Sequence, residues 1–348
     1  MKKIVLGVVC LLFLCGCGKI NEDNVVKEFE NKLAKSNSYH FDGSMQIISN
    51  EEKFDYKIDV SYLKDNYYKV VLVNQNNDHE QIILRNDDGV YVITPALNKS
   101  FKFQSEWPDN SSQAYILKSL LKDLKNTKDI KYEKNEKGYV LKSDVNYPNN
   151  SNLLYEKIYF DKNVNPIKVE VFDKNDNVAI KVDLNEIDFK ARLEKDNFSL
   201  DDLITEPNCE DDDCNKKQTK TCEGENCTEK SSALESAIYP LYVPEQSTLK
   251  SSETIETDNG NRQILTFSGD KEFVLVEETS SIPDEMELVP VYGDPYVLSS
   301  SVVALGVNSL SWTDNNIDFY LASNNLSGEE MLTIASSMSN SLSVLKSK

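Results

Sequence analysis

The stretch Phe54-Asp-Tyr56-Lys-Ile58-Asp-Val60 alternates apolar and charged side chains at every position. Successive side chains of a β-strand point to opposite faces of the sheet, so this alternation predicts a strand with one buried face and one wet face. The stretch Ile167-Lys-Val169-Glu-Val171 repeats the pattern, and polar turns such as Asn86-Asp-Asp-Gly89 separate the runs. The residues therefore predict a large antiparallel sheet with one buried face.

Two apolar stretches with helical spacing interrupt these strands. Val25, Val26, Phe29 and Leu33 recur every three or four residues, and a second helical stretch runs from Ala114 to Leu124. Spacing of this kind places apolar side chains on one face of a helix. We expect an α+β arrangement over residues 24–206, in which a curved sheet carries a few helices across its apolar face.

The pattern of apolar and polar residues changes from about residue 236. Short strand-like runs follow at 263–267, 272–276, 296–305 and 318–321. Near the end, Ser327 and Glu330 have the spacing of a capping box, and Leu326 is placed to pack on Met331. We therefore predict a second, small α+β domain at 236–348 that ends in a helix.

The N-terminus has the features of an export signal. Lys2 and Lys3 precede the apolar run 4–14, which is too short to span a bilayer as a finished helix. The end of the run, Leu14-Cys-Gly-Cys17, resembles the lipobox of bacterial lipoproteins. The resemblance implies that residues 1–16 are removed, that Cys17 carries a diacylglycerol, and that residues 17–23 tether the chain to the outer face of the cell membrane. An ordinary secretory signal that contains cysteines is the alternative.

Four of the seven cysteines remain after this processing, all in an acidic linker at 207–235. They occur in two similar sequence motifs, Cys209-Glu-Asp-Asp-Asp-Cys214 and Cys222-Glu-Gly-Glu-Asn-Cys227. An even number of cysteines outside the cytosol favours disulfides, while a zinc site and free or intermolecular thiols stay open. Of three possible pairings the repeat favours the local one, Cys209–Cys214 and Cys222–Cys227, which closes small loops and adds little global stability.

The charge of the chain excludes one class of partner. The net charge is −20, and it becomes about −22 when Lys2 and Lys3 leave with the signal. Because nucleic acid and anionic lipid are both negatively charged, bulk electrostatics argues against either as a partner. We expect no nucleic acid partner.

Few residues could carry out chemistry. The chain has two histidines, His40 and His79, for which structural roles are expected. The motif Ser119-Leu-Leu-Lys122 also occurs at 61–64 and 343–346, and none of the motifs that accompany it in serine enzymes is present. The run 173–177 begins like a calcium loop, but Val178 replaces the required glycine, so it predicts a hairpin turn. We expect no enzyme activity, no metal and no cofactor.

One long run carries a family resemblance. It extends from Gly89-Val-Tyr91 through Trp107-Pro108 to Tyr115, and continues at 154–161 and 166–169. It resembles the LolA-like bacterial lipoproteins of the YdcC/GerS type, found in spore-forming bacteria, over most of residues 25–200. The resemblance implies a half-barrel sheet with helices over its concave face. The C-terminal part resembles a small domain often appended to such lipoproteins.

The resemblance also implies a function. In the lipoprotein carriers the half-barrel cavity holds acyl chains, whereas some relatives bind and regulate a partner that remodels peptidoglycan. Since this chain is itself anchored, we favour a non-enzymatic scaffold or regulator with a cell-envelope protein partner, and the binding of lipid or acyl chains is the alternative. Most aromatic residues of the run are expected in the core. Four are candidates for a pocket mouth or partner surface: Phe101, Phe103, Trp107 and Tyr115.

Overall fold

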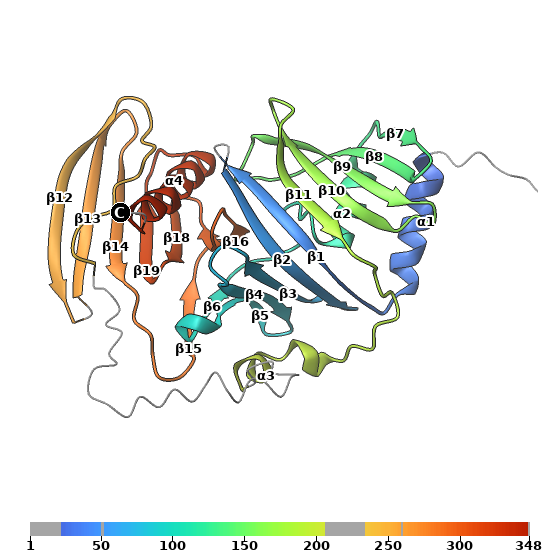
Figure 1. Ribbon diagram of the computed structural model, residues 1–348, viewed down its shortest axis with the longest axis horizontal. Coiled ribbons are helices and arrows are strands. Elements are labelled where there is room, and N and C mark those ends of the chain that lie inside the picture. Colours follow the sequence, from blue (N-terminus) through green and yellow to red (C-terminus); the bar gives the residue numbers. More distant parts are fainter. Residues whose placement is uncertain (1–21, 50–51, 206–233, 259, 347–348) are drawn as a thin grey trace, which may run out of the picture.

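The protein, as a computed structural model, is described at residues 22–49, 52–205, 234–258 and 260–346, and its strands form two sheets (Figure 1). The twelve-stranded first sheet has all neighbouring strands antiparallel except the parallel pair β15–β6. Its strands, in spatial order, are β15 (Glu287–Val291), β6 (Lys99–Phe103), β5 (Gly89–Thr94), β4 (Glu80–Asn86), β3 (Tyr67–Asn74), β2 (Glu52–Leu63), β1 (Ser38–Ser49), β11 (Val178–Leu184), β10 (Pro166–Asp173), β9 (Leu153–Asp161), β8 (Gly138–Asp144) and β7 (Lys131–Lys134).

The second sheet has seven strands, and its neighbouring strands are antiparallel. In spatial order they are β12 (Ser247–Thr257), β13 (Gly260–Gly269), β14 (Phe273–Thr279), β19 (Ile317–Ala322), β18 (Ser309–Asp314), β17 (Val302–Leu305) and β16 (Asp294–Val297). Figure 1 shows the sheet beside the first one, with α4 (Gly328–Lys346) packed on it.

The alternation that predicted the first sheet is confirmed. Tyr56, Ile58 and Val60 of β2 are buried, whereas Lys57 between them is exposed. The sheet is curved, and its concave face is covered by α1 (Glu22–Lys35) and α2 (Leu117–Asn126) (Figure 1). The predicted α+β half-barrel with helices over its concave face is therefore confirmed. The second helix begins three residues after its predicted start, because Gln113–Ile116 forms a turn whose Gln113 N–H donates to the hydroxyl of Ser119.

A continuous apolar core fills the space between the concave face and the helices. From the helices come Val25, Phe29, Leu33, Leu117, Leu120 and Leu124, all of them buried. A smaller cluster lies on the opposite face of the sheet, where the short helices η2 (Lys195–Phe198) and α3 (Leu200–Thr205) pack. The 3₁₀ turn η1 (Pro95–Leu97) connects β5 and β6. Both faces of β3–β5 are thus covered, which fits their apolar composition.

The predicted capping box of the last helix is confirmed. The Glu330 carboxylate accepts from the Ser327 N–H at 2.8 Å, and the Ser327 hydroxyl accepts from the Glu330 N–H at 3.2 Å. Leu326 and Met331 are both buried in the core of the second sheet. This start holds α4 against a stacked Trp312–Phe319 pair in that core.

The two sheets are joined by more than the linker. Strand β15 leaves the second half of the chain and extends the first sheet, pairing with β6 over five residues. Val302 and Ala304 of β17 are buried in the core of the first sheet rather than in the core of their own. The division at residue 236 that the sequence suggested stays a prediction.

Several predictions lie outside the described residues. They concern the signal 1–16, the lipid on Cys17, and the linker cysteines Cys209, Cys214, Cys222 and Cys227. Within the described ranges, no helix has the length and apolar character needed to span a membrane.

Candidate functional site

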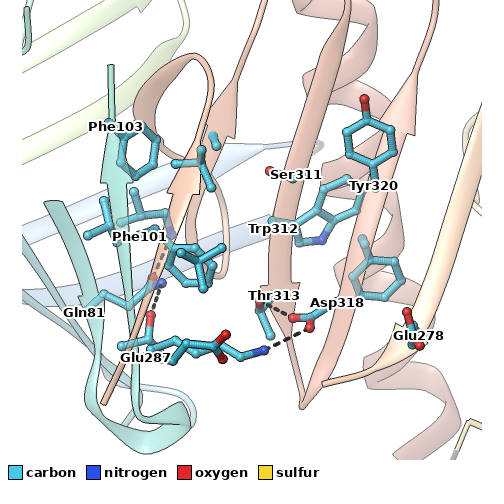
Figure 2. A pocket seen from close by; sticks show the side chains of 18 of the residues that line it. Gln81, Phe101, Phe103, Glu278, Glu287, Ser311, Trp312, Thr313, Asp318 and Tyr320 are labelled. Atoms are coloured by element: carbon cyan, nitrogen blue, oxygen red, sulfur yellow. Dashed lines mark hydrogen bonds and ion pairs between the residues drawn. The ribbon is translucent and has the colours of Figure 1, made fainter. Parts of the chain in front are cut away.

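A cavity of about 410 Å³ lies between the two sheets (Figure 2). Its floor is the concave face of β4, β5, β6 and β15, and its roof is one face of β14, β18 and β19. The walls are mainly apolar, and they include Val92, Phe101, Phe103, Val276, Val289, Val291, Val302, Ala304 and Phe319. A volume of this size is in the range of sites that hold a small ligand or a few side chains of a partner.

The strand register gives the cavity one polar and one apolar end. On the floor, Thr94, Lys99 and Glu287 lie opposite one another in a row, and the next row is Val92, Phe101 and Val289. The roof has the same order: one row comprises Glu278, Asp318 and Thr313, and the next comprises Val276, Tyr320 and Ser311. Figure 2 shows Glu287, Asp318 and Glu278 together below, with Phe103 and Tyr320 above. An occupant would therefore meet the charged groups at one end of the cavity.

Most charges at the polar end already have partners. The Lys99 ammonium is almost fully buried, and it lies 3.1 Å from Asp318 Oδ2 and 2.8 Å from the Ser280 hydroxyl. Arg262 lies 2.7 Å from Glu278 Oε2. Glu287 is exposed, and its carboxylate makes no ion pair with any residue in the described ranges. The polar end thus carries an excess of negative charge.

Two of the four predicted aromatic residues line this cavity, and two do not. Phe101 and Phe103 point into it from β6, as expected for a pocket wall. Trp107 is fully buried, with its ring edge-on to Tyr68 at 5.9 Å between centroids, and Tyr115 is also buried in the core of the first sheet. The loop after β6 turns inward beneath the helices, so the structure places Trp107 and Tyr115 in the core rather than at a surface.

Beneath α1 and α2, the concave face of the half-barrel is filled by the protein's own side chains. Those of α1 and α2, together with Trp107, occupy the position where the resemblance implies an acyl-chain cavity. A hollow of only about 30 Å³ lies beside Tyr115 and Tyr147. A larger groove of about 610 Å³ at one end of the second sheet is lined largely by amides and hydroxyls, such as Asn308, Asn324 and Ser268. The cavity between the sheets is therefore taken as the candidate site for an apolar group.

The groups considered for catalysis have structural roles. His40 Nε2 lies 2.8 Å from Asp59 Oδ2 in a half-exposed pair between β1 and β2. Asp173 accepts from the N–H groups of Asn175 and Asn177 at 2.8 Å, which confirms the hairpin turn. No group of three or more metal-ligating side chains occurs in the described ranges.

A buried pair of carboxyl groups escaped the sequence analysis. Burial raises the pKa of Asp123 to about 6, and burial together with the neighbouring Asp123 holds the pKa of Glu156 well above its usual range. The Ser143 hydroxyl donates to Glu156 at 3.0 Å. Glu156 alternates in step with Ile158 and Phe160 on the buried face of β9, and Asp123 follows Leu120 by three residues on α2. The spacing of apolar residues was therefore the signal that could have found this pair. The pair does not line the cavity.

Comparison with known proteins gives matches over nearly the whole chain. A family model described as sporulation protein YdcC-like matches residues 1–198. The sporulation protein YdcC of Bacillus subtilis (strain 168) is 34% identical over 346 residues, which cover 97% of this chain and 98% of that protein.

Solved structures give much weaker matches. The complex of Pseudomonas aeruginosa MucA and MucB matches at 13% identity over 88% of this chain and 96% of that chain, with a TM-score of 0.31. The CwlD amidase from Clostridioides difficile in complex with the GerS lipoprotein matches at 19% identity over 50% of this chain and 98% of that chain, with a TM-score of 0.29. No conclusion rests on these two likenesses.

Proposed function

Because this chain belongs to the sporulation protein YdcC-like family, we propose that it is a non-enzymatic protein of the cell envelope that binds and regulates a protein partner. The observation that carries the proposal is the apolar cavity between the sheets. Two of its ion pairs, Lys99–Asp318 and Arg262–Glu278, are internal, and the Thr313 hydroxyl is held by Asp318 at 2.6 Å. The apolar walls of this site suit the binding of an apolar group.

The membrane anchor belongs to the proposal. The lipobox Leu14-Cys-Gly-Cys17 supports lipid attachment at Cys17 and a location on the outer face of the membrane. Two acyl chains hold a protein at a bilayer far better than one. Replacing Cys17→Ser should therefore release the chain from the membrane fraction, and retention of the serine variant would argue for another anchor.

A protein partner is favoured over lipid cargo for two reasons. An anchored chain is poorly suited to carry lipid between membranes, and the part of the concave face beneath α1 and α2 is filled by the side chains of these helices. The alternative is an acyl chain in the cavity between the sheets, and the apolar walls of that cavity favour it. Mass spectrometry of an organic extract of the purified chain separates the two, because a bound lipid would support the alternative.

The test of the proposal uses the full chain in native membranes. Val276 lines the roof of the cavity and is half-buried, so Val276→Phe would fill part of the space. Val307→Phe is the control, because Val307 is 89% exposed and lies away from the cavity. We expect the partner to copurify with the wild-type and Val307→Phe chains and to be depleted at least tenfold with Val276→Phe. Equal recovery with all three would refute a role for the cavity.

The biological setting is also part of the proposal. The Bacillus subtilis relative is named as a sporulation protein, and we extend that role to this chain, with a peptidoglycan-remodelling partner. Deleting the gene should then reduce the yield of spores or their germination while vegetative growth stays normal. A defect confined to vegetative growth would assign the protein to general envelope upkeep.

The linker cysteines have a structural part in this proposal. Cys209–Cys214 and Cys222–Cys227 disulfides would stiffen the acidic linker. Peptide mapping of unreduced protein from the envelope should find both local disulfides. Four alkylatable thiols in that protein would contradict the pairing.

A further inference from the structure

The segment 281–292 borders the mouth of the cavity and carries only negative charge. It contains Asp284, Glu285 and Glu287 and neither lysine nor arginine. Ser281, Glu287, Val289 and Val291 line the cavity itself. Exposed apolar side chains occur along the same segment: Ile282 is 52% exposed, Tyr292 is 76% exposed, and Leu288, which is 51% exposed, alternates with Glu287 and Val289 and so points to the other face of β15. A surface that combines apolar side chains with unpaired acids fits a partner that combines apolar side chains with basic ones.

The polar end of the cavity also favours a basic group on the partner. Lys99 is paired with Asp318, and Arg262 is paired with Glu278, so these four charges balance. Glu287 adds a carboxylate that has no ion pair within the described ranges. Because apolar walls reduce the screening of charges inside a cleft, this carboxylate attracts a cation and repels an anion more strongly than it would on an open surface.

Strand β15 lies at the edge of the first sheet, but its free edge is a poor template for another strand. The Glu287 N–H donates to the carbonyl oxygen of Asn98 at 2.8 Å, on the β6 side. Backbone groups alternate along a strand, so residue 290 directs its backbone to the free edge. That residue is Pro290, which has no N–H to donate. A partner is thus expected to bind through its side chains rather than by adding a strand.

Resting on the proposed function, we infer that the cavity accepts a partner segment in which an apolar side chain lies next to lysine or arginine. The apolar side chain lies among Phe101, Val289 and Val276, in the second row of floor and roof. The cationic group lies at the polar end, where Glu287 meets it.

Two fluorescein-labelled peptides test the preference. Both contain leucine and phenylalanine in the centre, followed by two lysines in one peptide and by two glutamates in the other. We expect the full-length wild-type chain to bind the lysine peptide at least tenfold more tightly, with a difference that shrinks as salt is raised. Glu287→Lys should abolish or reverse the preference. Glu253→Lys is the matched control, because Glu253 is exposed on β12 and should leave the preference unchanged.

Three outcomes would overturn the inference. They are equal affinity of the wild-type chain for both peptides, a preference that survives Glu287→Lys, and binding of an alkyl maltoside with no binding of either peptide. The last outcome would assign the cavity to lipid. Each variant is first shown to unfold at the wild-type temperature, so that lost binding cannot reflect lost folding.

The failure of this inference can be told apart from the failure of the proposed function. If the native partner is retained by Glu287→Lys and lost with Val276→Phe, the cavity binds a partner without the basic preference. If Val276→Phe retains the partner, the proposed function itself fails, whatever the peptides show.

Discussion

The phenolic hydroxyl of Tyr56 in the first sheet donates a hydrogen bond of 3.0 Å to the carbonyl oxygen of Ser299, between two strands of the second sheet. The same hydroxyl lies 3.3 Å from the carbonyl oxygen of Leu298. Tyr56 is buried, so this bond joins the two halves of the chain away from water. Like the pairing of β15 with β6, this bond joins the two sheets directly.

Removing this hydroxyl should destabilise both sheets at once. Tyr56→Phe leaves the Ser299 carbonyl oxygen buried without this donor, and a buried unsatisfied group costs about 1–3 kcal/mol. We expect the free energy of unfolding to fall by about that amount in a denaturant titration. Tyr155→Phe is the matched control, because the Tyr155 hydroxyl donates to Asp176 at an exposed site within the first sheet. A loss in the control as large as that in Tyr56→Phe would contradict the special role of the inter-sheet bond.

Trp107 should matter for stability and not for binding. Its side chain is fully buried in the core, so Trp107→Ala should lower the free energy of unfolding by about 3–5 kcal/mol. The folded fraction should still capture the partner, because Trp107 does not line the cavity. Thermal unfolding and copurification measure the two effects separately. Leu241→Ala, at a residue that is 67% exposed, should change stability by no more than about 0.5 kcal/mol. If a folded Trp107→Ala chain failed to bind the partner, Trp107 would be reassigned to the binding site.

Glu277 should make stability depend on pH. Burial raises its pKa to about 8 from an ordinary value of 4.5, although the Ile238 N–H donates to its carboxylate at 2.8 Å and opposes the shift. The folded state then holds the proton more tightly than the unfolded state does. Stability from this group is fully present below pH 4.5 and is lost as the pH rises through 8.

The measurement compares the wild-type chain with Glu277→Gln. The glutamine can still accept from Ile238 but cannot ionise, so the variant should gain stability relative to the wild type as the pH rises. The difference should grow by up to about 1.4 kcal/mol per pH unit. Asp123 and Glu156 also have raised pKa values, but they are present in both chains and cancel in the difference. Parallel curves for the two chains would contradict the assignment to Glu277.

The sequence predicted those features of the fold that depend on residues close together in the chain. The alternation from Phe54 to Val60 set the buried face of β2, and Ser327 with Glu330 set the start of α4, because both signals involve residues close in the chain. The pairing of Val289 with Phe101 could not be predicted, since it joins segments far apart in sequence and five-residue strands carry little register information. The cavity depends on that pairing. The sequence identified Phe101 and Phe103 as candidates for a pocket, but it did not identify the residues of the roof that face them.

The burial of individual side chains was the second feature that the sequence did not predict fully. Trp107 and Phe103 are similar in sequence terms, being aromatic residues near a loop, yet one is enclosed beneath the helices and the other lines the cavity. Glu277 alternates in step with Leu275 on β14, and Glu156 alternates in step with Ile158 on β9, so local pattern places both acids on inward faces. The degree of their burial depends on the packing of distant segments, which local pattern does not give.

The most direct test of the central claim places a photocrosslinker inside the cavity. Phe101→p-benzoylphenylalanine puts the reactive ketone on the floor, next to Val289. After illumination of intact cell envelopes, a protein adduct of defined mass should form, and it should disappear when Val276→Phe is added. An adduct with lipid alone, or no adduct in illuminated envelopes, would contradict the account that this cavity binds a protein partner.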